Sequence, residues 1–234
     1  MKVVTWNCNG ALRNKFQTIS KLDADIYVIQ ECENPTLTNN DDYKKWSNNH
    51  IWIGDNKNKG LGIFAKNDII LEKLKWENQF NALDVKYFLP CLINNEFKIV
   101  GVWNHKNNSS SFAYIGQFWK YLQVNKIHFD SKTLIVGDFN SNSIWDQNDR
   151  WWNHTDVVNE LSEITLESLY HLKMNHLQGE ELNHTYFQYR HESKKYHIDY
   201  IFGNLKFVEN YEIKILDFND WKEFSDHVPI ILEF

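Results

Sequence analysis

The chain has 234 residues, of which 31 are acidic and 25 are basic, so the formal net charge is −6. This balance argues against a protein that coats nucleic acid by bulk charge, and a 42% share of hydrophobic residues excludes a disordered chain. No apolar run approaches the ~20 residues that cross a bilayer, and three cysteines without paired spacing argue against a disulfide framework. We therefore expect a cytoplasmic protein with no membrane partner, folded as one domain over residues 1–234.

Apolar patterning predicts a chain in which strands outnumber helices. In chain order we expect a strand over 2–7, a helix over 12–22, strands over 25–31, 62–65 and 97–103, a helix over 112–122, a strand over 133–137, a helix over 155–164, and strands over 196–202, within 207–218 (one or two) and over 228–234. Pro90 and Pro229 are expected at strand starts, where a missing donor is tolerated. Because helices and strands do not alternate strictly, the order favours an α/β layered sandwich with mixed sheets.

Polar side chains follow or precede these apolar strands again and again. Six such junctions are Asn7, Gln30-Glu31, Asn104-His105, Gly137-Asp138-Phe139-Asn140, His197-Ile198-Asp199 and Ser225-Asp226-His227. Each has an ordinary alternative as a turn former, a loop carboxylate or a surface histidine. Burying such groups singly is costly unless they are paired or bound to metal, so their number indicates one shared, partly solvated site.

In this order the motifs resemble those of the endonuclease/exonuclease/phosphatase superfamily, whose members include deoxyribonuclease I, exonuclease III and the abasic-site endonucleases. The matching segments run from Asn7 to His227, and the most specific are Gly-Asp-Phe-Asn at 137–140 and Ser-Asp-His-x-Pro at 225–229. The resemblance implies a four-layer α/β/β/α sandwich of the deoxyribonuclease I type, with two packed mixed β-sheets flanked by helices. It also places the site at one edge, where strand ends meet.

A phosphodiester carries negative charge that repels an incoming hydroxide, so its hydrolysis needs charge neutralisation and an oriented nucleophile. Mg²⁺ suits this task, with Mn²⁺ as a substitute, and prefers a few oxygen ligands. With the support of the resemblance, we assign Glu31 and Asn7 as metal ligands, and Asp226 as a third, direct or through water. Asn9 stands where the abasic-site branch often has Asp, which weakens the expectation of a second carboxylate ligand at this position. We therefore group Asn9 with the substrate-binding residues.

The catalytic candidates divide into two pairs and a single histidine. Asp138 and Asn140 are two residues apart, which puts both on one face of an extended chain. We assign Asp138 as general base or water orienter and Asn140 as its positioning partner. Asp199 is expected to set the tautomer of His227, which contacts the phosphate as an acid or donor, with a role as base left open. His105 matches a histidine of the deoxyribonuclease I type, which implies a hydrogen bond to the phosphate or to the leaving oxygen.

Substrate-binding candidates follow the Asp138 motif. Trp145, Arg150 and Trp151 lie in a segment whose aromatic side chains could stack on a base. The alternative, weighted at least equally, is that Trp151 and Trp152 anchor this loop in the core. If they stack, a single strand, a frayed end or a free nucleotide would suit better than an intact duplex.

The residues leave three functions open. We expect first a monomeric, metal-dependent nuclease that acts on nucleic acid, with DNA as first choice. The alternative is a phosphodiesterase or phosphatase for a small nucleotide or another soluble phosphoester. An inactive binding module is disfavoured, because none of the expected polar positions carries an apolar residue.

Overall fold

Two six-stranded sheets dominate the computed structural model, which describes every residue except 108. The first sheet has β1 and β2 as its parallel pair, and its other neighbours run antiparallel. Its strand order is β15 (Glu212–Ile215), β16 (Ile230–Glu233), β1 (Lys2–Asn7), β2 (Ile26–Cys32), β4 (Lys59–Ala65) and β3 (His50–Asn56).

The second sheet is also mixed, with β9 and β10 as its parallel pair. Its strand order is β11 (Glu167–Ser168), β14 (Asp199–Gly203), β10 (Thr133–Asp138), β9 (Phe97–Trp103), β8 (Phe88–Ile93) and β5 (Leu71–Lys73). Two small ladders complete the strands: β6 (Gln79–Phe80) with β7 (Leu83–Asp84), and β12 (Tyr186–Phe187) with β13 (Lys195–Tyr196).

The sheets pack face to face through alternate residues of their strands, because side chains on a strand point to opposite faces in turn. The core between the sheets includes Val3, Ile26, Val28, Ile99, Leu134, Val136 and Ile201. The residues between these positions point outward and meet helices instead. The same alternation therefore decides which polar residues at the strand ends enter the gap between the sheets.

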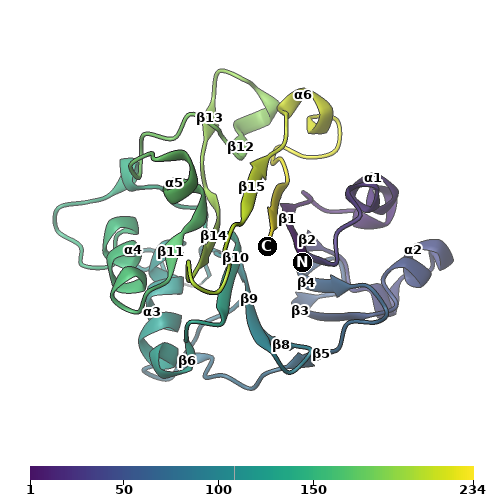
Figure 1. The fold of residues 1–234 in the computed structure, drawn as a ribbon, viewed down its shortest axis with the longest axis horizontal. Coiled ribbons are helices and arrows are strands. Elements are labelled where there is room, and N and C mark those ends of the chain that lie inside the picture. Colours follow the sequence, from purple (N-terminus) through teal and green to yellow (C-terminus); the bar gives the residue numbers. More distant parts are fainter. Residues whose placement is uncertain (108) are drawn as a thin grey trace.

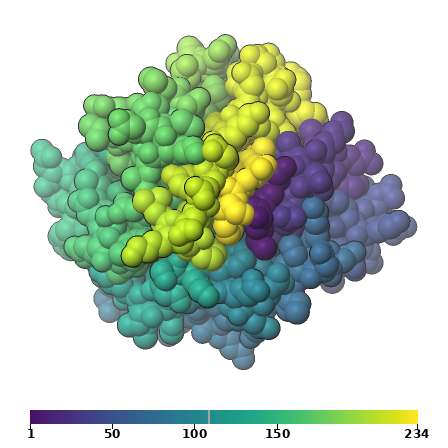
Figure 2. Space-filling model, in the orientation of Figure 1, coloured from purple at the N-terminus to yellow at the C-terminus, as the bar shows by residue number. Residues whose placement is uncertain are grey.

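Helices cover both outer faces and give four layers, as predicted (Figure 1). On the first sheet lie α1 (Phe16–Ile19), α2 (Asp41–Trp46) and α6 (Phe218–Trp221), and on the second lie α3 (Ile115–Asn125) and α4 (His154–Glu163). The short α5 (Leu169–Met174) packs beside β14 and β15. The two ends of the chain lie side by side (Figure 2), because β1 pairs with β16. Over the residues that the structure describes, no helix combines the length and the apolar character needed to span a membrane.

Two predicted elements are broken in the structure. The predicted helix over 12–22 is instead a chain of short turns: Leu12–Asn14, α1 and Ser20–Leu22. Lys15 interrupts it with φ −127° and ψ −12°, outside the helical range. The predicted strand over 196–202 is divided between β13 and β14, with 197–198 outside both. This break matters for function, because it lets Asp199 begin a strand in the second sheet.

Strand ends and missed strands account for the other differences. The segment 207–218 holds one strand, β15, and the final strand begins at Ile230 rather than at 228. Pro90 lies inside β8 rather than at its start, and its carbonyl accepts a hydrogen bond from Leu74 N at 2.9 Å. The missing N–H therefore faces the end of the short edge strand β5, where its loss is tolerated. The apolar pattern missed nine elements, which are β3, β5, β6, β7, β11, β12, α2, α5 and α6, and of β8 it indicated only a start at Pro90. Pro229 precedes its strand as expected.

Candidate active site

Three buried polar side chains enter the gap between the two sheets at one edge. Asn7 ends β1, Asp138 ends β10, and Asp199 begins β14. Each shares its strand face with the apolar residues of the inter-sheet core. Asp138 and Asp199 are direct partners in the antiparallel β10–β14 ladder, which puts two carboxylates beside each other. Strand alternation therefore carries these groups to one place from positions up to 192 residues apart in the chain.

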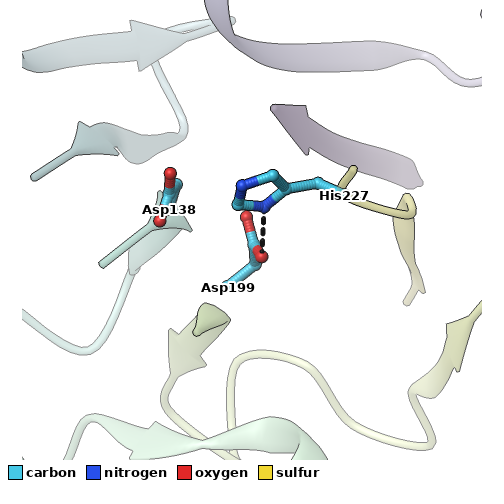
Figure 3. Close-up of side chains that lie close together, drawn as sticks. All are labelled: Asp138, Asp199 and His227. Carbon is cyan, nitrogen blue, oxygen red and sulfur yellow. Dashed lines mark hydrogen bonds and ion pairs between the residues drawn. The ribbon is translucent and has the colours of Figure 1, made fainter. Parts of the chain in front are cut away.

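His227 completes this cluster from the segment before β16. Its Nδ1 lies 2.9 Å from Oδ2 of Asp199, as Figure 3 shows with Asp138 beside the pair. Asp138, Asp199 and His227 each offer one atom within 4.8 Å of the others. The hydroxyl of Thr185 accepts the N–H of Asp199 at 3.1 Å, which fixes the start of β14. The sequence prediction that Asp199 pairs with His227 agrees with this geometry.

The charge state of His227 is set by its neighbours. Burial by itself lowers the pKa of the imidazole, but the charge and hydrogen bond of Asp199 and the charge of Asp138 raise this pKa to about 10. At neutral pH His227 is therefore an imidazolium whose Nδ1–H donates to Asp199. This leaves the second N–H, on Nε2, as a donor for an anion.

Asp138 is fully buried, and its two oxygens accept three hydrogen bonds. Asn7 Nδ2 and Asn140 Nδ2 each donate to Oδ2 at 2.9 Å, and the backbone N–H of Asn140 donates to Oδ1 at 2.8 Å. Burial and the negative charge of Asp199 raise the pKa of Asp138 to about 8, while His227 and these N–H groups favour the carboxylate. A carboxyl poised near neutral pH is suited to proton transfer.

The Gly-Asp-Phe-Asn motif has a steric reason for each of its other residues. Gly137 has φ +146°, and a Cβ there would lie 2.0 Å from the carbonyl oxygen of Val102. Phe139 is fully buried and packs in the core beneath α3, with its ring 5.0 Å from that of Phe118. Asn140 turns the chain back with φ +46°, so that its backbone and side chain both reach Asp138.

Glu31 reaches the same edge through a β-bulge in β2. The pairing with β4 skips it, since Gln30 is opposite Leu61 and Cys32 is opposite Gly60. Glu31 has φ +61°, and a bulge of this kind turns its side chain out of the regular alternation. Its Oε1 lies 3.4 Å from Asn7 Nδ2, and its Oε2 lies 2.6 Å from Lys59 Nζ.

The remaining predicted residues lie around this centre. Asn9 donates its backbone N–H to Oδ1 of Asn7 at 3.0 Å, and the Oδ1 of Asp226 lies 3.4 Å from Ser225 Oγ. His105 is exposed just after β9, and burial lowers its pKa while the charge of Glu31 opposes this. The structure thus brings Asn7, Glu31, Asp138, Asn140, Asp199 and His227 together, with Asn9, His105 and Asp226 at the margin.

A family model described as the endonuclease/exonuclease/phosphatase family matches residues 4–227, which span both sheets and all of these motifs. The chain belongs to this family. Its members are phosphoester hydrolases that include nucleases and phosphatases. No curated protein matches the sequence at a significant level.

Solved structures of this family share the fold across the full chain. A 3′–5′ exonuclease (NExo) from Neisseria meningitidis superposes with a TM-score of 0.67 at 17% identity, covering 100% of this chain and 99% of the other. An AP endonuclease from Archaeoglobus fulgidus gives 0.70 at 14% identity with the same coverage of both chains. A 3′ phosphatase NExo from Neisseria, bound to a product DNA hairpin, gives 0.66 at 16%, again covering 100% and 99%. At these identities the likeness shows the fold, and confirms the predicted α/β sandwich.

Oxygen donors that suit a divalent metal ion lie at this family's strand-end site. Glu31 offers carboxylate oxygens, which Mg²⁺ accepts. The neighbouring Asn7 turns its Nδ2 toward Glu31, and its Oδ1, the atom that could bind a metal ion, accepts the N–H of Asn9. Nearby, Oδ1 of Asp199 is buried and has no hydrogen-bond partner among the described residues. A buried acceptor of this kind is costly unless a donor or a cation satisfies it, so the donor set fits a hard divalent cation.

A pocket of about 350 Å³ opens beside the cluster of Asp138, Asp199 and His227, on the side of Asn140 and Tyr186. It is lined by Asn140, Tyr186, Ile198 and two of the predicted substrate-binding residues, Trp145 and Arg150. Trp151 lies next to it with 64% of its surface exposed and its ring 4.7 Å from that of Trp152. Trp152 is buried and stacks on Phe112 at 4.2 Å. The core-anchor alternative therefore fits Trp152, which is buried but also lines the pocket. Trp151 is exposed and is not among the described residues that line it.

Several residues of the site had no role in the sequence analysis. The ring of Tyr186 lies 4.7 Å from that of His227 and also lines the pocket. Ser225 donates its hydroxyl to the carbonyl of Asn7 at 2.7 Å and accepts the N–H of His227 at 3.0 Å, which ties β1 to the C-terminal segment. Its place in the Ser-Asp-His motif was a usable signal. Tyr186 and Thr185 gave none, because their segment is irregular and far from the motifs in sequence.

The raised pKa values of Asp138 and His227 predict a bell-shaped pH profile. Asp138 must be ionised to accept a proton, so kcat/KM should rise with pH, about tenfold per unit, on the acid side. The pKa of Asp138 is about 8, and an added divalent cation would lower it. We therefore expect the rising, acid limb of the profile to have its midpoint at or below pH 8. Activity should fall again near pH 10, where His227 loses its proton.

Initial rates on a soluble diester, measured from about pH 5 to about pH 11, check this profile. Rates that decline steadily as pH rises from neutrality would contradict the assignment of Asp138 as base.

Proposed function

We propose that the protein is a divalent-metal-dependent nuclease that hydrolyses DNA phosphodiester bonds by attack of water. The observation that carries this proposal is the convergence of Asp138, Asp199 and His227 within 4.8 Å, beside Glu31 and Asn7. A buried base, an oriented imidazolium and a nearby set of oxygen ligands are the groups that diester hydrolysis requires. The DNA hairpin in the Neisseria 3′ phosphatase structure supports DNA as the first substrate to test.

In this proposal each residue has a separate role. Asp138 takes the proton from the attacking water, and Asn140 and Asn7 hold its carboxylate in place. His227 donates from Nε2 to the scissile phosphate, and Asp199 orients it through Nδ1. His105, at the exposed rim, donates a hydrogen bond to a phosphate oxygen or to the leaving oxygen.

Glu31 and Asn7 would hold Mg²⁺ or Mn²⁺, with Asp226 as the third candidate ligand. When bound, such an ion supplies positive charge that neutralises the phosphate. The charges of Asp226 and Asp138 both raise the pKa of His227, which supports a site in which these three side chains lie close together.

The pocket beside Asn140 suggests how a strand end is held. Its size falls within the range of small-molecule sites, and the aromatic ring of Trp145 and the charge of Arg150 suit a base and a phosphate. Asn9 and the exposed Trp151 lie where they could extend this contact. This arrangement favours a single strand or a frayed end over an intact duplex. The proposal also includes a single domain, since the two sheets share one core. It further includes a monomer, which gel filtration checks, and a cytoplasmic location, which cell fractionation checks.

A substrate panel tests the proposed function directly. The protein is incubated with Mg²⁺ or Mn²⁺ and labelled single-stranded DNA, double-stranded DNA, RNA, and a set of nucleotides. We expect metal-dependent cleavage of DNA that chelation abolishes. An Asp138→Asn variant purified in parallel controls for contaminating nucleases and should cleave at least about 10²-fold more slowly. Turnover of nucleotides without cleavage of any polymer would replace the nuclease by a soluble phosphoesterase.

Trp145 offers a prediction about substrate binding. Its ring is partly exposed and lies 5.0 Å from that of Tyr196, at the wall of the pocket. Loss of one base–aromatic stack should raise KM for single-stranded DNA in Trp145→Ala by roughly 5- to 150-fold, with kcat changed much less. Trp145→Phe, which keeps a stacking ring, should restore most of the affinity. An alanine variant with an unchanged KM would show that this pocket does not hold the strand.

A further inference from the structure

We propose that Lys59 is an internal counter-ion of the ligand Glu31, which competes with the divalent cation and transfers to the substrate phosphate when the cation binds. The inference rests on the proposed function, because it takes Glu31 as a metal ligand. It assigns a role to a lysine on the hairpin formed by β3 and β4.

The backbone brings the two charges together. The bulge in β2 leaves Glu31 unpaired between Gln30 and Cys32, whose partners in β4 are Leu61 and Gly60. Lys59 directly precedes Gly60 and is the first residue of β4, so its side chain starts beside the bulge. The result is a contact of 2.6 Å between Lys59 Nζ and Glu31 Oε2.

The contact uses the part of Glu31 that a metal ion would need. One carboxylate oxygen, Oε1, lies 3.4 Å from the Asn7 amide, and the other is held by Lys59. A divalent cation that binds this carboxylate meets the positive charge of the ammonium at short range, so the two repel each other. The cation therefore binds more weakly while Lys59 holds its position.

Lys59 is free to leave Glu31. Its side chain is 49% exposed, against 18% for Glu31, and a lysine stem is flexible with a single charge at its end. The charge of Lys59 acts on His105, the rim residue that we assign to the phosphate, so the ammonium lies near that residue. A bound phosphate offers Lys59 a second anionic partner and thereby removes its competition for Glu31.

This exchange couples the two ligands thermodynamically. If substrate draws Lys59 away from Glu31, substrate tightens metal binding, and the metal tightens substrate binding by the same factor. The hairpin lysine would then keep metal affinity low until a phosphodiester arrives.

The test measures Mn²⁺ binding itself, by calorimetric titration and by the signal of free Mn²⁺ in electron paramagnetic resonance. Lys59→Met should bind Mn²⁺ about two- to fivefold more tightly than the wild-type protein, the range that exposed ion pairs span. Lys59→Arg should restore the wild-type affinity. Lys57→Met is the matched control, because it removes the same charge from the same hairpin two residues away. At saturating Mn²⁺, Lys59→Met should also raise KM for a DNA oligonucleotide.

Two comparisons separate the possible failures. Equal Mn²⁺ affinities for the Lys59→Met and Lys57→Met variants would overturn the inference, since the effect would then be one of general charge. Glu31→Gln should bind Mn²⁺ far more weakly than the wild type. If Glu31→Gln binds as well as the wild type, the proposed metal site itself is wrong; if it does not, and Lys59→Met is unchanged, only the role of Lys59 fails.

Discussion

Replacing Asp138 by asparagine is expected to lower kcat for DNA hydrolysis by about 10²–10⁴-fold, the usual contribution of a general base. The amide cannot take the proton of the attacking water. It also places an NH₂ group against the N–H donors of Asn7 and Asn140, which now point at carboxylate oxygens. Single-turnover cleavage of a labelled oligonucleotide at saturating Mn²⁺ measures the loss of the chemical step.

Asp130→Asn is the matched control for this experiment. Asp130 precedes β10, at the opposite end of the strand that Asp138 ends, and pairs with Lys98 on the surface. Its replacement removes one carboxylate from the same part of the fold and should leave the rate within about twofold, as surface changes usually do. Circular dichroism of both variants confirms that they fold. An Asp138→Asn protein with near wild-type rates would remove the proposed base from the mechanism.

The His227–Asp199 pair should behave as one unit. Each of His227→Gln and Asp199→Asn is expected to lower kcat by about 10²–10⁴-fold, and the double variant should be no slower than the worse single one. The reason is that Asp199 acts on the substrate only through His227, with which it shares a hydrogen bond of 2.9 Å. A double-mutant cycle in kcat therefore measures their coupling.

The pH profile distinguishes this role of Asp199 from a merely structural one. Asp199 is the partner that raises the pKa of His227. In Asp199→Asn the alkaline limb, near pH 10 in the wild type, should move to lower pH, because the imidazolium loses its stabilising charge. His128→Gln, an exposed histidine at the far end of β10, is the control and should keep the wild-type profile. Strictly additive losses with an unmoved limb would show that the two residues act separately.

The candidate residues of this site could be named from the sequence because apolar strands end in polar residues, and because the order of these ends resembles the motifs of the superfamily. Asn7, Asp138 and Asp199 each occupy the position in a strand that continues an inward-facing apolar series. Because both faces of β1, β10 and β14 are buried, their sequences alone do not show which face the polar residue takes. The local regularity of apolar runs also explains why β1, β2, β4, β9 and β10 and the two longest helices, α3 and α4, were predicted to within a few residues.

Local patterns failed where neighbouring parts of the chain decide the structure. Apolar spacing over 12–22 suggested one helix, but the irregular backbone at Lys15 divides it. Pro90 was expected at a strand start, but it is tolerated inside β8 because the strand beside it ends at Lys73. In both cases the structure depends on the backbone around the residue and not on the apolar pattern.

By itself, the sequence of this protein determined which residue types stand at the strand ends and the superfamily to which their order belongs. The register of β2 on β4 decided that Glu31 occupies a bulge and meets Lys59. An isolated antiparallel bridge between Tyr186 and His227 decided that the Tyr186 ring lies against His227 and beside a pocket. These contacts join residues far apart in the chain, and their geometry depends on register and on the relative placement of whole sheets. Short-range patterning indicates where a buried strand ends in a polar residue, whereas the face and the partner of that residue are set by tertiary packing.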